Sequence, residues 1–199
     1  MDADQRGGIV LGIGSGAMVT TVFGAVWLGL GLAAINAFSW WLAVVFAVCC
    51  LGLYVASLRV LRRGRKLRSK GAAPRWSAKM RNGFIWAVVA EIVGCLAVIL
   101  ICNLLRRADL IPAGIALVVG LHFLPLAKIF RAPIYYATGM LIPLWCVASF
   151  LLFRGPAIDV AAAIGTGIVL WLTSAYGLIR ARTLLALSPG ESALGTAQP

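Results

Sequence analysis

Six long apolar runs constrain the fold of this chain more than any other feature. A helix that crosses a bilayer needs about 20 mostly apolar residues. Runs that reach or approach this length cover residues 9–35, 38–58, 83–105, 110–127, 133–153 and 160–179. Hydrophobic residues make up 62% of the chain and charged residues 12%, a balance that excludes an ordinary soluble domain. The sequence therefore predicts an all-α membrane protein, with a bundle of six transmembrane helices in one domain over residues 1–182.

The distribution of lysine and arginine predicts the orientation of this bundle. When the N-terminus is placed inside, only Arg106, Arg107 and Arg154 of the 18 basic residues fall outside. Cytoplasmic loops carry an excess of Lys and Arg, so both termini are predicted to be cytoplasmic. Residues 183–199 lack apolar periodicity and are expected to form a disordered cytoplasmic tail.

Most of the basic residues gather in a single cytoplasmic loop, predicted at residues 59–81. Leu58, Leu61 and Leu67 lie among these charges, which suggests that the second helix continues as an amphipathic stalk. Cations beside a span attract anionic lipid, by about 1 kcal/mol for each residue. Headgroup contacts are predicted for Arg62, Arg63, Arg65, Lys66 and Arg68. The orientation rule already explains the charge, so a nucleic-acid partner is not predicted.

Small residues recur at every fourth position in the first apolar run. They are Gly8, Gly12, Gly16, Thr20 and Gly24. This spacing places them on one face of a helix, and such faces let membrane helices approach closely. The sequence favours an internal helix as the neighbour and leaves a homodimer open.

Glu91 and His122 are, apart from Cys and Tyr, the only ionisable side chains inside the apolar runs. A charge at the centre of a bilayer costs at least about 2.5 kcal/mol, so each residue indicates a functional site. They lie on consecutive spans joined by a short loop, and such spans are usually neighbours. The two side chains are therefore close enough in sequence and depth to meet, directly or through one water, as an ionised pair or as a neutral one, and the sequence does not choose between these arrangements.

Polar side chains favour the cytoplasmic half of the predicted bundle. Tyr135 and Tyr136 open the fifth run at that side. Together with Glu91 and His122 they predict a ligand or proton site that opens toward the cytoplasm. The competing interpretation is that Glu91 and His122 form a buried pair that only holds two helices together.

Three functions fit these residues. The first is a small transporter or channel subunit, because intramembrane acids and histidines often bind cations or relay protons. The second is a membrane scaffold or regulator that uses the basic loop. The third is a membrane-embedded enzyme with Ser15 as nucleophile and His122 as base. No metal-ligand spacing or cofactor motif is found, and the five cysteines are interpreted as small hydrophobic residues.

The segment Leu121-His-Phe-Leu-Pro-Leu-Ala127, followed by Tyr135-Tyr136 and Gly139, resembles segments of uncharacterised bacterial multi-spanning membrane families. This resemblance covers about 20 residues and names no activity. It implies a multi-pass protein of the bacterial inner membrane, and it assigns no functional residue.

Overall fold

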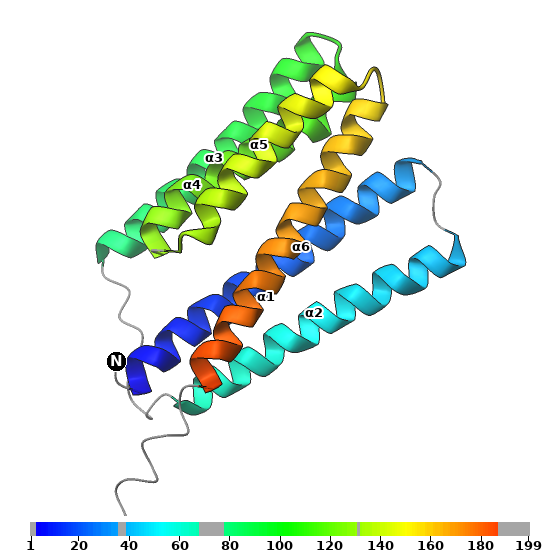
Figure 1. Cartoon of the computed structure of the whole chain (residues 1–199). Helices are drawn as coiled ribbons and strands as arrows, with labels where there is room; N and C mark the ends of the chain where they lie inside the picture. Colours follow the sequence, from blue (N-terminus) through cyan, green and yellow to red (C-terminus); the bar gives the residue numbers. More distant parts are fainter. Residues whose placement is uncertain (1–2, 36–38, 68–77, 131, 187–199) are drawn as a thin grey trace, which may run out of the picture.

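The structure is a computed structural model that describes residues 3–35, 39–67, 78–130 and 132–186. Every regular element in this part of the chain is helical (Figure 1). The helices are α1 (Ala3–Ala34), α2 (Trp40–Leu67), α3 (Ala78–Leu104), α4 (Ile111–Phe130), α5 (Ile134–Leu152) and α6 (Ala157–Ala186), with a short 3₁₀ helix, η1 (Ala108–Leu110), before α4. Six of them are long and apolar enough to cross a membrane. The expected all-helical architecture with six candidate spans is confirmed.

Two helices extend beyond the predicted bounds, and tertiary packing explains both differences. α2 continues to Leu67, into the expected basic loop, because Val60 and Gly64 are buried against α1. α6 continues to Ala186, where the tail was expected from residue 183, because Leu184 and Leu185 pack against the buried residues of α1, α2 and α6. The rest of the basic loop and of the tail lies outside the described residues.

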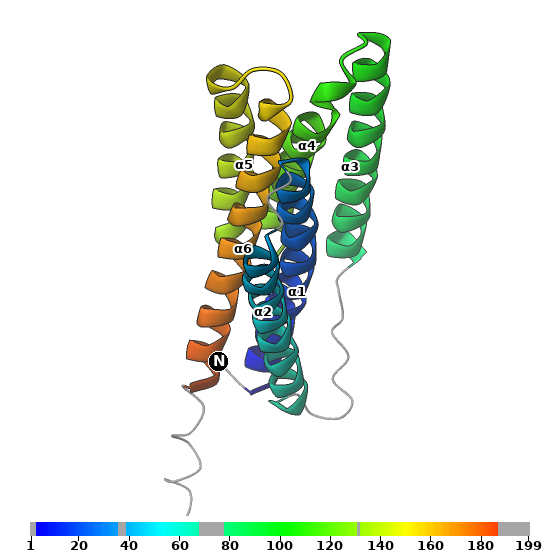
Figure 2. The same ribbon diagram turned by 90° about the vertical axis from the view of Figure 1, so that its right-hand side faces the viewer.

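α6 lies at the centre of the bundle, where it contacts α1, α2, α4 and α5. α1 and α2 pack on one side of it, while α4 and α5 pack on the other. α3 lies at the edge, where α4 and η1 are the only described elements that it contacts. Both views show α1 and α2 extending below the lower ends of α3 and α5 (Figure 2). α1 begins and α6 ends at that lower end, which we call the terminal end of the bundle (Figure 1).

The buried side chains form two clusters, and both include residues of α6. The larger one joins α1, α4, α5 and α6 through Trp27, Ala116, Val119, Phe123, Ile142, Cys146, Ala162, Ala163 and Leu170. The smaller one joins α1, α2 and α6 near the terminal end through Val10, Ala17, Val60, Leu178 and Ala181. α6 has eleven buried residues, whereas α3 has only Ala87. The core is therefore built around α6, and α3 is a peripheral helix.

Candidate functional site

Glu91 and His122 meet at the interface between α3 and α4. The Nδ1 atom of His122 lies 3.6 Å from Oε2 of Glu91 and 3.1 Å from the carbonyl oxygen of Ala87. Ala87 precedes Glu91 by one helical turn, so both groups face the same side of α3. The structure thus brings together the two ionisable residues that the sequence places in neighbouring spans.

The contact with Ala87 determines which ring nitrogen of His122 carries a proton. A carbonyl oxygen only accepts hydrogen bonds, so Nδ1 donates to it in either charge state. The other nitrogen, Nε2, has no hydrogen-bond partner among the described residues. Nε2 is therefore the ring nitrogen that is open to a further partner.

The two side chains differ in burial. The side chain of His122 is 11% exposed, and that of Glu91 is 26% exposed. Glu91 lies on the peripheral helix, so its carboxyl group is the more open member of the pair. The pair is thus accessible from the α3 side of the bundle.

The structure separates the two tyrosines from this pair. Phe123 lies between His122 and Tyr135, since its ring centroid is 6.2 Å from that of His122 and 5.5 Å from that of Tyr135. Tyr135 lines a small pocket between α1, α5 and α6. Tyr136, the next residue, is 47% exposed. The four predicted site residues therefore occupy three different places.

The small residues of α1 divide into two groups. Gly24 packs against Gly167 and Trp171 of α6, Gly16 lies against the hydroxyl group of Tyr135, and Thr20 is buried. By contrast, a methyl group at Gly8 or Gly12 would meet no other atom within 4 Å. The inner part of this stripe thus faces helices of the same chain, and its first turns face outward.

The basic residues at the end of α2 lie at the terminal end of the bundle. Arg62, Arg63, Arg65 and Lys66 are exposed on the last turns of this helix, while Arg68 lies outside the described residues. The buried side of the same turns packs on α1, as Val60 and Gly64 show. The end of α2 is thus a cationic surface fixed to the bundle.

Ser15 lies far from any base. Its hydroxyl group is exposed and donates to the carbonyl oxygen of Gly12 in its own helix, 3.0 Å away. α1 contacts neither α3 nor α4, which carry Glu91 and His122. The arrangement of a serine nucleophile beside His122 is therefore absent from the described part of the chain.

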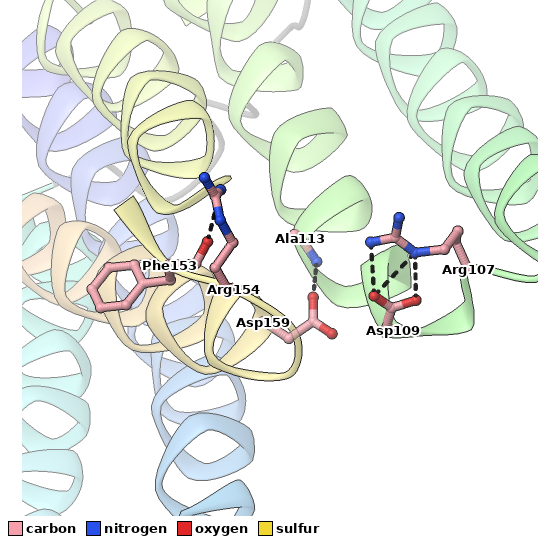
Figure 3. A network of polar contacts seen from close by, with 6 residues as sticks. All are labelled: Arg107, Asp109, Ala113, Phe153, Arg154 and Asp159. Carbon is pink, nitrogen blue, oxygen red and sulfur yellow. Dashed lines mark hydrogen bonds and ion pairs between the residues drawn. The ribbon is translucent and has the colours of Figure 1, made fainter. Parts of the chain in front are cut away.

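A polar network at the opposite end of the bundle was not anticipated from the sequence (Figure 3). Oδ1 of Asp159, in the first turn of α6, accepts a hydrogen bond of 3.3 Å from the backbone N–H of Ala113 in α4. Arg107 forms an ion pair with Asp109, with 3.0 Å between Nη2 and Oδ2, and the bonds to this carboxylate raise the pKa of the guanidinium. Asp159 thus joins the start of α4 to the start of α6, where a free helix N-terminus favours an anion.

A regular spacing along α6 could have revealed this residue. Asp159, Thr166, Thr173 and Arg180 follow one another at intervals of seven residues. Such a spacing places polar groups on one face of a helix that is otherwise apolar. Thr166 and Thr173 are buried, and Arg180 lines the pocket beside Tyr135.

The fold and the ionisable pair define a helical protein with the composition of a multi-pass membrane protein. A model of a family of unknown function, DUF7010, matches residues 75–180, more than half of the chain, so the protein belongs to this family. The matched segment contains Glu91, His122 and Tyr135. No curated protein and no solved structure matches the chain.

Proposed function

We propose that this protein is a small membrane transporter or channel subunit in which Glu91 and His122 form a protonatable site. The observation that supports the proposal is the contact between the two side chains, with 3.6 Å between Nδ1 and Oε2. Ionisable residues at membrane depth are costly, and they mark ion pathways and proton relays in many membrane proteins.

Two groups of the pair, the imidazole of His122 and the carboxyl group of Glu91, can each bind a proton. Nδ1 of His122 is held as a donor by the carbonyl oxygen of Ala87, and Nε2 is free to bind a proton. The carboxyl group of Glu91 is the second place, and it is partly exposed. An imidazolium and a carboxylate lower the charge penalty of one another, so the pair can hold one exchangeable proton at zero net charge, and release of that proton leaves the pair with a charge of −1.

The orientation of the chain belongs to this proposal. The terminal end of the bundle carries Arg62, Arg63, Arg65 and Lys66 at the end of α2, and Arg180 and Arg182 near the end of α6. Because cytoplasmic segments are enriched in Lys and Arg, we place this end in the cytoplasm of a bacterial cell, with the bundle in the inner membrane.

Reconstitution into proteoliposomes tests the proposed role. We expect an inward proton gradient to dissipate faster in vesicles with the wild-type protein than in empty ones, as reported by a trapped pH-sensitive dye. Glu91→Gln should abolish this flux, because an amide does not exchange a proton near neutral pH. Asp109→Asn is the matched control, since it makes the same chemical change in the ion pair with Arg107 at η1, which does not include Glu91 or His122.

Two outcomes would contradict the proposal. Flux that survives Glu91→Gln would remove this carboxyl group from the mechanism. Flux that is lost equally in Asp109→Asn would show that the change acts through the fold. Surface biotinylation of cysteine variants placed at the α5–α6 connection and at the end of α6 would test the orientation separately.

The exposed cations of α2 favour a second candidate, a non-catalytic scaffold or regulator that binds anionic lipid. Arg62, Arg63, Arg65 and Lys66 project from a helix end fixed on α1. Four changes to glutamine should weaken the preference of the protein for anionic over zwitterionic nanodiscs. The scaffold is favoured if the double variant Glu91→Gln, His122→Gln retains full biological function.

A further inference from the structure

The pocket beside Tyr135 has the size of a site for one small ion. It lies between α1, α5 and α6 near the terminal end of the bundle, with a volume of about 40 Å³. Its polar lining consists of Thr20, Tyr135, Thr173, Tyr176 and Arg180. A cavity of about 150 Å³ holds a benzene molecule, whereas a water needs only a small fraction of that volume. The occupant is therefore a water molecule or an ion of similar size.

The hydroxyl group of Tyr135 is a donor available to such an occupant. It lies so close to Gly16 that a methyl group at that position would overlap it. The ring is fixed by Phe123 and Phe130, whose centroids are 5.5 and 6.4 Å away. Tyr135 is half-buried, and its hydroxyl group has no hydrogen-bond partner among the described residues, whereas buried tyrosine hydroxyls usually find one.

The other lining groups make the pocket positive and poor in carboxylates. Thr20 donates to the carbonyl oxygens of Gly16 and Ala17, and Thr173 donates to that of Val169, so their protons are already used. Arg180 carries the only charge among the lining residues. No described acidic residue lines the pocket, and the whole chain has a net charge of +12. A cation would therefore be repelled, while an anion would meet a guanidinium and a free O–H donor.

We propose that this pocket is a binding site for a small monovalent anion of the size of chloride. The hydroxyl group of Tyr135 donates to the anion from the inner side, and Arg180 supplies the positive charge. The site is distinct from the Glu91–His122 pair, because Phe123 lies between them. The test of the anion site is therefore independent of the test of the proton site.

The anion dependence of thermal stability tests this proposal. The full-length protein is purified in a non-ionic detergent, and its tryptophan fluorescence reports Tm. Potassium chloride replaces potassium gluconate at constant ionic strength, because gluconate is too large for the pocket. We expect the Tm of the wild type to rise with chloride and to saturate, as it does when a ligand binds only the folded state.

Two pairs of neighbouring residues provide variants with matched controls. Tyr135→Phe and Arg180→Gln should each raise the half-saturating chloride concentration at least tenfold. Tyr136→Phe and Arg182→Gln make the same changes at exposed residues that do not line the pocket, so they should leave it unchanged. Arg180 is exposed, so Arg180→Gln keeps the test decisive if Tyr135→Phe fails to fold.

Two results would overturn the anion site. A wild-type Tm that is the same in chloride and gluconate would show that the pocket holds only water. A saturable rise that persists unchanged in both Tyr135→Phe and Arg180→Gln would place the chloride elsewhere.

Discussion

The contact between α1 and α6 and the contact between α3 and α4 join helices by different means. At the first, two backbones touch: a Cβ atom placed at residue 167 would lie 2.8 Å from the carbonyl oxygen of Gly24. At the second, a Cβ atom placed at residue 94 would lie 2.9 Å from a methyl group of Val118, which belongs to a side chain. Backbone atoms in a helix have no alternative position, whereas a side chain can change its rotamer.

The polar contacts at the two interfaces also differ in how closely they hold the helices together. Between α1 and α6, the hydroxyl groups of Thr21 and Ser174 lie 2.7 Å apart, and Ser174 also donates to the carbonyl oxygen of Ala17. Between α3 and α4, the closest polar contact is the one of 3.1 Å from Nδ1 of His122 to the carbonyl oxygen of Ala87, and the contact of 3.6 Å with Glu91 is longer and partly exposed. The ionisable pair thus lies at the interface that has fewer fixed contacts. That difference suits a site that exchanges protons.

The largest expected effect is the difference in stability between alanine substitutions at Gly167 and at Gly94. Gly167→Ala should lower the free energy of unfolding by about 2–3 kcal/mol, because the new methyl group meets the backbone of α1. Gly94→Ala should cost less than about 1 kcal/mol, because the side chain of Val118 can move and alanine favours the helix. Equilibrium unfolding in mixed detergent–SDS micelles measures both values.

Gly52→Ala serves as the control for this prediction. A methyl group at residue 52 would meet no other atom within 4 Å, so only the helix preference for alanine remains. This variant should be at least as stable as the wild type. Equal costs for Gly167→Ala and Gly94→Ala would remove the distinction between the two interfaces.

A smaller effect is expected at the hydroxyl pair between α1 and α6. A double-mutant cycle with Thr21→Val and Ser174→Ala should give a coupling free energy of about 0.6–1.7 kcal/mol, the range of hydrogen bonds between membrane helices. Thr183→Val is a suitable control, because its exposed hydroxyl group bonds only to Ile179 of the same helix. A coupling near zero would mean that the two hydroxyl groups bond independently to the backbone.

The sequence predicted the number and type of the helices because membrane spans are long and uniformly apolar. It also indicated that Glu91 and His122 can meet, since adjacent spans joined by a short loop usually pack together, but it left open whether they form a pair. It did not predict that Tyr135 faces α1 and α6, because hydropathy carries no information on how far a helix is rotated. The leucines among the basic residues suggested that the second helix continues past residue 58, but not that Gly64 of this extension packs on α1, because hydropathy does not show which helix lies beside it.

The remaining site residues depend on contacts between distant parts of the chain. Arg180 and Gly16 are separated by most of the sequence, yet both line the Tyr135 pocket. No local pattern in either segment indicates the other. The seven-residue intervals between the polar residues from Asp159 to Arg180 show that α6 has a polar face. Only the fold shows which helices pack against that face.

The smallest expected effect on stability is that of Glu91→Gln. The carboxyl group lies 3.6 Å from its partner, which is longer than a hydrogen bond, and hydrogen bonds between membrane helices contribute only about 0.6 kcal/mol on average. Its removal leaves His122 bonded to the carbonyl oxygen of Ala87. His122→Ala removes that bond as well, so it should be the more destabilising change, by about 1 kcal/mol. The same unfolding measurement compares the two variants. A loss of more than about 2 kcal/mol in Glu91→Gln would show that the pair holds α3 to α4, because a carboxyl group that only carries protons has little part in stability. The α3–α4 interface would then be as fixed as the α1–α6 interface, and the proposed proton site would lose its support.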